Sequence, residues 1–254
     1  MLIGLTGYGK MGSLIRQKAL EKGHEVPLIT DPFSSAAEVT ERKLPSEAVK
    51  LDVIIDFSDP HVVVGNIRQY SKIKVPAVVG TTGWYDHITE VARLVKKSGI
   101  GLIWSANFSL GVNLFFHIIK KAGRIMNRFS EYDAMVHEYH HRHKAESPSG
   151  TAHIIGEILI DALDNKQSVF AGTLEGRKEE SALHISSTRG GSIPGTHRVT
   201  FDSVVDTITL EHTTKNRDGF AEGAIMAAEW ISGRKGFYHI DQMLQSVIGG
   251  EENG

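Results

Sequence analysis

The stretch that decides the fold is Leu2-Ile3-Gly4-Leu5-Thr6-Gly7-Tyr8-Gly9-Lys10-Met11-Gly12, at the start of the chain. Its first half is a short apolar run typical of a buried parallel strand, and its second half is a Gly-x-Gly-x-x-Gly motif that opens a helical pattern. In such a strand–turn–helix unit the glycines allow a tight turn and close approach to a pyrophosphate, whose charge faces the helix N-terminus. The sequence therefore predicts a dinucleotide site that comprises Gly7, Tyr8, Gly9, Lys10, Met11 and Gly12.

An acidic residue follows this motif at the expected distance. Asp31 ends the second predicted strand, about 20 residues after the glycines, where a carboxylate binds the ribose hydroxyls and repels a 2′-phosphate. No arginine follows it directly, which favours NADH. Hydroxyl and basic side chains nearby can still favour a phosphate, namely Ser34, Ser35, Lys10, Arg42 and Lys43. We therefore expect both NADH and NADPH to serve, with NADH at least as good.

The first part of the chain alternates short apolar runs with helical patterns, which indicates a parallel sheet with crossover helices. We expect strands at 2–6, 26–30, 53–57, 75–79 and 101–104, and helices at 11–22, 62–70 and 88–97, the second of which Asp59-Pro60 would cap. The segment 31–50 predicts no element. Loops after the fourth and fifth strands lie at the carboxyl edge, where ligands bind in open α/β sheets. As isolated loops they can equally be ordinary turns, but they add Gly80, Thr81, Thr82, Ser105, Ala106, Asn107 and Phe108 as candidate nucleotide contacts.

The alternation of short apolar runs with helical patterns ends at Leu110. A broad apolar helix face comprises Phe115, Ile118, Ile119, Ala122, Ile125 and Met126, and a histidine-rich strand and a helix at 149–163 follow it. Segments 182–189, 197–202 and 204–212 are expected to form antiparallel strands, the last with one buried face. A final helix at 220–231 carries small residues that permit close packing on a sheet. The predicted fold is α/β: a Rossmann-type parallel-sheet domain at 1–108 and 218–254, and a second α/β domain of mostly antiparallel strands at 109–217.

The run from Glu138 to Ala152, EYHHRHKAESPSGTA, places titratable and cationic side chains directly before a helix start. Histidine changes charge near neutral pH and lysine is a point cation, so together they can supply protons and hold carboxylates. The backbone N–H groups of Ser149, Gly150 and Thr151 are expected at the helix N-terminus, which binds anions. The run therefore indicates a catalytic arrangement for an anionic substrate.

Two other interpretations of this run remain open. As an extended strand it would carry His137, Tyr139, His141 and His143 on one face, which is compatible with a solvated sheet edge. Four histidines within seven residues are also chemically able to hold zinc or nickel. No HxxxH pair on a helix, no cysteine and no obvious carboxylate ligand accompanies them, and neighbouring cations would repel a metal ion, so we expect no metal.

The composition excludes several classes of function. The 254 residues are 41% hydrophobic and carry 28 Lys+Arg against 30 Asp+Glu, a net charge of −2, so we expect no nucleic-acid partner and no membrane association. The absence of cysteine excludes thiol nucleophiles, disulfides and thiolate metal sites. No apolar segment approaches the ~18 residues of a membrane span, and we expect a cytoplasmic protein.

Several motifs together resemble one family, the 4-hydroxy-tetrahydrodipicolinate reductases (dihydrodipicolinate reductases) of bacterial lysine and diaminopimelate biosynthesis. The resemblance covers nearly the whole chain, and its most specific part is the His-His-x-x-Lys run that leads to Pro-Ser-Gly-Thr. The other motifs are Gly7–Gly12, Ile55–Pro60, Gly80–Gly83, Ser105–Asn113, Arg189–Gly191, Gly195–His197, His212–Arg217 and Gly223-Ala224.

The resemblance implies a specific reaction. The cyclic product of the preceding synthase would be reduced to tetrahydrodipicolinate, with loss of water, by hydride from NADH or NADPH. His140 would be the family's proton donor and acceptor, and Lys144 its second proton donor. Substrate-binding positions would be His141, Gly150, Thr151 and Arg217, the last facing a carboxylate of a small dicarboxylate substrate. The family also implies a homotetramer in which the sheets of the second domain pair.

One part of the catalytic run departs from the family pattern, which commonly reads Lys-x-Asp-Ala-Pro-Ser-Gly-Thr. Glu146 and Ser147 replace the Asp and Ala, so the acid is kept but is one methylene longer. Two other hypotheses also stay open: another Rossmann reductase that acts on a small oxo or imino acid, and a nucleotide-sensing regulator without catalysis. Donors clustered near His140 favour the reductase, because a doubly anionic substrate needs them.

Overall fold

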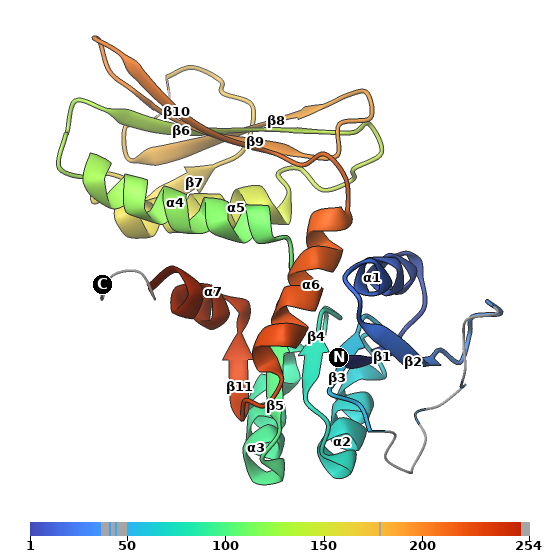
Figure 1. Ribbon diagram of the computed structural model, residues 1–254. Helices are drawn as coiled ribbons and strands as arrows, with labels where there is room; N and C mark the ends of the chain where they lie inside the picture. Colours follow the sequence, from blue (N-terminus) through green and yellow to red (C-terminus); the bar gives the residue numbers. More distant parts are fainter. Residues whose placement is uncertain (37–40, 42–43, 45–49, 178, 250–254) are drawn as a thin grey trace. The chain divides into compact units, whose positions relative to one another are not determined.

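The chain folds into two compact units, each built around its own β-sheet (Figure 1). One unit comprises Met1–Leu110 and Asp218–Gly254, and the other is Gly111–Arg217. This computed structural model describes residues 1–36, 41, 44, 50–177 and 179–249. Arg42 and Lys43, which the sequence offers as possible phosphate contacts, lie outside the described residues. None of the described helices is long and apolar enough to cross a lipid bilayer.

The first unit contains a six-stranded parallel sheet in the order β11-β5-β4-β3-β1-β2. Leu5 of β1 lies opposite Ile29 of β2 and Ile55 of β3. The chain therefore reverses its direction across the sheet at β1, which makes the carboxyl ends of β1 and β3 the position where open α/β sheets bind ligands. The strands are β1 (Leu2–Thr6), β2 (Glu25–Thr30), β3 (Val53–Asp56), β4 (Ala77–Val79), β5 (Gly101–Trp104) and β11 (Gly236–His239).

Helices cover this sheet in two pairs, since α1 packs on α6 and α2 packs on α3. Right-handed crossovers in opposite directions from β1 and β3 put α1 on one face and α2 with α3 on the other. The small residues of α6 allow the expected close packing: a Cβ on Gly223 would lie 1.8 Å from the carbonyl oxygen of Phe108. The helical elements are α1 (Lys10–Glu21), α2 (Val63–Ile73), η1 (Tyr85–His87), α3 (Ile88–Ser98), α6 (Asp218–Ile231) and α7 (Ile240–Ile248).

Two predictions for this unit need correction. The Asp59-Pro60 pair does not cap α2, which begins at Val63; the carboxylate of Asp59 instead accepts a hydrogen bond of 2.8 Å from the backbone N–H of His61, in a turn before the helix. The elements β11 and α7 were not predicted at all. β11 has four half-buried residues without alternation, so its sequence carries no period that indicates a strand.

The second unit contains a mixed five-stranded sheet in the order β10-β9-β6-β8-β7. β9 pairs antiparallel with β6 and β10, as expected, but β8 runs parallel to β6 and β7. The expectation that all three segments between 182 and 212 are antiparallel is therefore wrong for β8. A helix, α5 (Gly150–Ala162), follows β6 and carries the chain back before β7 and β8, as parallel pairing requires. The strands are β6 (Asp133–His140), β7 (Ser168–Phe170), β8 (Ala182–Arg189), β9 (Thr196–Asp202) and β10 (Thr207–Thr213).

One face of this sheet is covered by α4 (Leu110–Met126) and α5 (Figure 1). The core between them comprises Phe115, Ile119, Ala152, Ile155, Leu159, Ala134, Val136, Leu183, Ile185, Val199 and Phe201. Since side chains alternate along a strand, Glu138 and His140 share the covered face with Val136. Their strand β6 is the central strand of the sheet, so the interpretation of the histidine run as a solvated edge is wrong.

The exposed parts of this unit also differ from the predictions. Ile118 and Ile125, assigned to the apolar face of α4, are 51% and 60% exposed. The last strand, expected to bury one face, is β10, an edge strand in which Leu210 is only half-buried and Ile208 is 43% exposed. Helix α5 packs mainly on β6, β7 and β8, so the edge strand β10 has less cover and its alternating pattern does not produce a buried face.

Candidate functional site

Each of the three glycines in the first motif is explained by a different feature of the structure. Gly7 has φ +87°, and a Cβ there would lie 2.4 Å from the carbonyl oxygen of Phe57. A Cβ on Gly12 would lie 2.1 Å from the carbonyl oxygen of Gly7, so this glycine lets α1 pack against the loop that follows β1. A Cβ on Gly9, the N-cap of α1, would meet nothing within 4 Å. The backbone beside Gly9 is therefore open to a ligand, which is the cradle that a pyrophosphate needs.

A cavity of about 380 Å³ adjoins this loop at the carboxyl ends of β1, β2 and β3. Of the predicted residues, Gly7, Gly9 and Asp31 line it. Tyr8, Lys10, Met11 and Gly12 belong to the same loop and to the first turn of α1. Other residues that line the cavity were not predicted, among them Phe33, Phe57, Ser58 and Asn66. Only their place in the sequence could have indicated these residues. Each of them either follows a strand at the ligand-binding edge of the sheet or lies on α2, which faces that edge.

Asp31 does more than face the cavity. Its Oδ2 accepts a hydrogen bond of 2.7 Å from the backbone N–H of Tyr8, and its Oδ1 accepts bonds of 2.8 and 2.9 Å from the N–H groups of Phe33 and Ser34. The carboxylate therefore joins the glycine loop to the turn after β2. A charged acceptor with backbone donors is a strong pairing, so the loop is ordered around this side chain.

The other predicted nucleotide residues lie on the same edge of the sheet but do not line the cavity. Gly80, Thr81 and Thr82 follow β4, and Ser105–Phe108 follow β5. Two of their hydroxyls form hydrogen bonds within the protein. Thr81 donates to the buried carboxylate of Asp56 at 3.0 Å, and Ser105 donates to the carbonyl oxygen of Asn107 at 2.8 Å. Ala106 and Thr82 are exposed, whereas Phe108 is buried.

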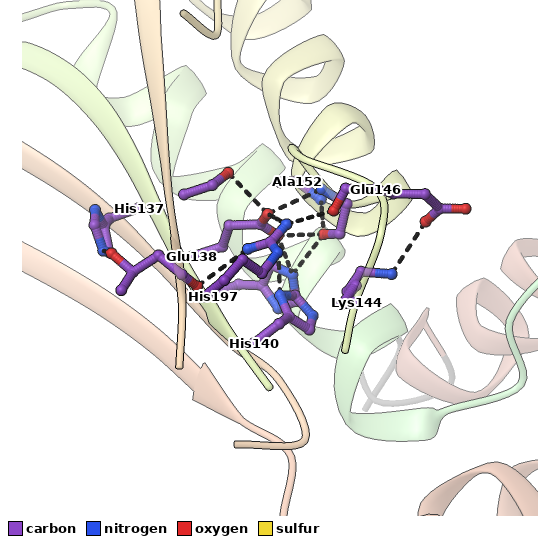
Figure 2. A network of polar contacts seen from close by, with 11 residues as sticks. His137, Glu138, His140, Lys144, Glu146, Ala152 and His197 are labelled. Carbon is purple, nitrogen blue, oxygen red and sulfur yellow. Dashed lines mark hydrogen bonds and ion pairs between the residues drawn. The ribbon is translucent and has the colours of Figure 1, made fainter. Parts of the chain in front are cut away.

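The second unit centres on the carboxylate of Glu138, which has no solvent exposure (Figure 2). Its Oε1 accepts hydrogen bonds from the backbone N–H of Ser149 at 2.9 Å, the hydroxyl of Ser187 at 2.9 Å and the guanidinium of Arg189 at 2.7 Å. Its Oε2 accepts from the Ser149 hydroxyl and lies 3.4 Å from Nε2 of His197. Burial alone would raise the pKa of this carboxyl, but the hydrogen bonds outweigh it and hold the pKa well below its usual range. Glu138 is therefore an anion at neutral pH.

Ser149 connects this carboxylate to the start of α5. It is the N-cap residue, and its hydroxyl oxygen accepts a bond of 3.2 Å from the N–H of Ala152. Its own N–H was expected to bind an anionic ligand, but it donates to the carboxylate of Glu138 instead. The N–H groups of Gly150 and Thr151, in the same first turn, have no acceptor among the described residues. These two donors are suited to bind a carboxylate.

His140 lies beside this turn and is 6% exposed. Its Nδ1 is 3.3 Å from Oε2 of Glu138, at an angle that does not make a hydrogen bond. Burial is the main reason that the pKa of His140 falls to about 4; Glu138 opposes the fall, while His197, Lys144 and Arg189 add to it. The imidazole is therefore neutral at pH 7, ready to accept a proton.

The remaining predicted substrate residues differ in how close they lie to this cluster. Lys144 donates to Oε2 of Glu146 at 3.0 Å, so the longer acid reaches the lysine. His141 is half-buried, and its buried Nδ1 has no partner among the described residues. Arg217 is exposed at the end of the unit, and no hydrogen bond among the described residues joins it to His140.

The structure also provides the carboxylate that a metal site at the histidines would need. One donor atom each from Glu138, His140 and His197 lies within 4.8 Å of the others. The expectation that no carboxylate accompanies the histidines is therefore wrong, because Glu138 lies beside them. The guanidinium of Arg189 nevertheless lies 2.7 Å from Glu138, and a cation placed here would face its charge at short range. The donor set therefore fits a hydrogen-bonded network better than a metal ion.

Comparisons with known proteins agree over nearly the whole chain. Residues 1–108 match the N-terminal domain and residues 111–244 the C-terminal domain of the family described as dihydrodipicolinate reductase. A 4-hydroxy-tetrahydrodipicolinate reductase of Christiangramia forsetii is 33% identical over 98% of this chain and 99% of its own length. That of Methanoregula boonei is 37% identical over 93% and 94%. The solved structure of a dipicolinate-bound dihydrodipicolinate reductase from Paenisporosarcina sp. TG-14 has a TM-score of 0.78 at 23% identity, covering 95% of this chain and 99% of that one. This likeness shows that the two share a fold.

The depressed pKa of His140 predicts a pH dependence of stability. The unfolded histidine binds a proton near pH 6.5 and the folded one only near pH 4, so the folded protein is favoured above this window and loses that advantage as pH falls through it. We expect the free energy of unfolding to fall by on the order of 3 kcal/mol from this group. Below pH 4.5, protonation of Glu138 should weaken the fold further, because its pKa is also depressed.

Urea unfolding of wild type and of His140→Gln at several pH values measures this slope. The variant should have a shallower decline between pH 6.5 and pH 4, whereas His87→Gln, at a histidine whose side chain is 55% exposed, should behave like wild type. Equal slopes for wild type and His140→Gln would contradict the assignment.

Proposed function

The chain belongs to the dihydrodipicolinate reductase family, and we propose that its substrate binds at His140, Lys144 and the N-terminal turn of α5. The protein is an NAD(P)H-dependent reductase of 4-hydroxy-tetrahydrodipicolinate in lysine and diaminopimelate biosynthesis. The observation that carries the proposed site is the pair of N–H groups of Gly150 and Thr151 beside a buried histidine. We further propose the cytoplasm as its location, since NADH and NADPH are both present there.

The glycine loop of the first unit would hold the nucleotide. The open backbone at Gly9 and the N-terminus of α1 suit a pyrophosphate, and Asp31 suits a ribose. When bound, the reduced nicotinamide supplies a hydride. We infer that the loops after β4 and β5, with Gly80–Thr82 and Ser105–Phe108, serve its nicotinamide side, because they continue the same edge of the sheet from the cavity.

The second unit would hold the dicarboxylate. Gly150 and Thr151 donate their N–H groups to one carboxylate, and Lys144 and His141 add donors on the same segment. Arg217 is assigned to a carboxylate by the family motif alone, since the described contacts do not join it to the cluster. The net charge of −2 does not attract the substrate, so this local set of donors must bind it.

Proton transfer is the part of the reaction that the protein's own side chains perform. Loss of water from the substrate removes a ring proton and a hydroxyl group, and reduction of the resulting conjugated system then adds a hydride and a proton. Neutral His140 can accept a proton in the first step and return it later, and cationic Lys144 can donate to the leaving hydroxyl or to the reduced ring. Glu146 holds the Lys144 ammonium at 3.0 Å, which keeps it beside the site.

The activity is tested by coupling the purified protein to the upstream synthase and following nicotinamide absorbance. We expect the absorbance to fall only when both the synthase product and this protein are present. A protein that binds the nucleotide but never oxidises it under these conditions would contradict the assigned function.

The roles of His140 and Lys144 predict a specific kinetic effect. Proton donors and acceptors contribute about 10²–10⁴-fold to the rate, so His140→Gln and Lys144→Ala should lower kcat by such factors. Nucleotide affinity, measured by the fluorescence of bound NADH, should survive in both. If either variant keeps a kcat near that of wild type, the role of that residue is wrong.

The Asp31 carboxylate predicts the nucleotide preference. It repels a 2′-phosphate, while Lys10 and the serines after β2 offset part of this effect, so both NADH and NADPH should serve with NADH at least as good. Steady-state kcat/KM for each nucleotide at saturating substrate measures the preference. A preference for NADPH above about tenfold, or ~1.4 kcal/mol, would mean that basic residues override Asp31.

We also infer that the protein is a homotetramer assembled through the sheet of residues 111–217. The exposed edge strand β10, with Ile208 43% exposed, and Met135, 40% exposed on the face opposite α4 and α5, support association. Light scattering at micromolar concentration should give about four times the 27.9 kDa of one chain. A mass near that of one chain would contradict the inference.

A further inference from the structure

We propose that Glu138 is a positioning residue of the substrate site, which holds the first turn of α5, the segment 144–149 and His140 in one arrangement. The proposal rests on the proposed function of this site, in which Gly150 and Thr151 bind a carboxylate and His140 moves a proton. Glu138 has no solvent exposure and therefore does not touch the substrate itself.

Its first contact sets which N–H groups face the substrate. Glu138 takes both the backbone N–H and the hydroxyl of Ser149, so this residue is held from two sides at the N-cap position. The hydroxyl oxygen in turn accepts from Ala152, which satisfies a third donor of the turn. The helix start is thereby fixed with Gly150 and Thr151 left as donors. Without Glu138, the N–H of Ser149 would lose its acceptor, and the helix start would no longer be held at this residue.

Its second contact acts through Arg189. One nitrogen of this guanidinium donates to Oε1 of Glu138 at 2.7 Å and to the carbonyl oxygen of Glu146. The pair therefore holds the backbone two residues beyond Lys144. On the other side of Lys144, the chain is held at the end of β6, where the N–H of Gly190 donates to the carbonyl oxygen of His140 at 2.9 Å. Lys144 thus lies between two fixed points, both of which involve the end of β8.

Its third effect is electrostatic. Charged or titratable groups face His140 from three strands and a loop: Glu138 on β6, His197 on β9, Arg189 on β8 and Lys144 on the segment after β6. Of these four, Glu138 alone stabilises the protonated imidazole, and the others oppose it. Neutralising Glu138 should therefore move the proton affinity of His140 down, not up.

The test compares Glu138→Gln with Glu211→Gln in the complete protein. The introduced glutamine keeps the length and one acceptor oxygen of the Glu138 side chain but lacks its charge. Glu211, on β10 of the same sheet, pairs with Arg198 at 2.7 Å on the surface and serves as the matched control. Three quantities are measured: the affinity for pyridine-2,6-dicarboxylate by calorimetry, the affinity for NADH by fluorescence, and kcat as a function of pH.

We expect Glu138→Gln to weaken dicarboxylate binding about tenfold and to lower kcat by up to about 10²-fold, because displaced catalytic groups lose rate steeply. The limb of the pH profile that reports His140 should shift to lower pH. NADH affinity should stay at the wild-type value, and Glu211→Gln should match wild type throughout. A folded Glu138→Gln with wild-type dicarboxylate affinity and an unshifted pH limb would overturn the proposal.

Arg189→Lys provides a second variant that leaves the buried carboxylate in place, in case Glu138→Gln does not fold. Lysine keeps the charge, but its side chain is shorter, so its ammonium should not reach both the carboxylate of Glu138 and the carbonyl oxygen of Glu146 as the single arginine nitrogen does. We therefore expect kcat to fall while NADH affinity stays unchanged. Wild-type kcat in Arg189→Lys would overturn the proposed hold on the segment. Failure of the reductase assignment is distinguishable, since wild type itself would then show no turnover of the synthase product.

Discussion

A buried carboxylate needs donors from several directions, and in this protein that requirement organises the substrate unit. Leaving Glu138 unpaired inside the sheet would cost several kcal/mol, so the fold is stable only when side chains from β8 and β9 and the start of α5 converge on it. Arg189, Ser187, Ser149 and His197 all do so. The network therefore joins three strands and a helix, and the same groups surround His140.

The nucleotide unit also contains a buried, hydrogen-bonded carboxylate, which lies at the carboxyl edge of its sheet. Asp56, at the end of β3 and fully buried, accepts hydrogen bonds from the hydroxyls of Tyr70 at 2.7 Å and Thr81 at 3.0 Å and from the amide of Asn66 at 3.1 Å. Burial is the main cause of the raised pKa of Tyr70, which keeps its proton for this bond. Both units thus use an acid near the carboxyl end of a strand to hold the loops that face a ligand. Loops fixed in this way are pre-organised, which reduces the entropy lost on binding.

The two catalytic candidates sit in contrasting environments, and this contrast suits proton transfer in two directions. His140 is buried and neutral because its surroundings are short of water and rich in positive charge. Lys144 is partly exposed and pairs with Glu146. A neutral acceptor and a cationic donor within one short segment can serve both the loss of water and the later protonation.

The sequence by itself determined the parts of this protein that depend on local pattern. The glycine motif after β1, the parallel strands of the first unit, and the histidine strand followed by the Ser149 cap were all predictable, because strand and helix periods and turn residues act over a few positions. Tertiary structure decided what depends on register between distant strands. Arg189 is 51 residues from Glu138, and its meeting with that carboxylate required β8 to run parallel to β6, which the alternation of β8 does not specify. The same reason explains why the N–H of Ser149 was assigned to the substrate: its true acceptor, Glu138, comes close only when α5 packs on the sheet.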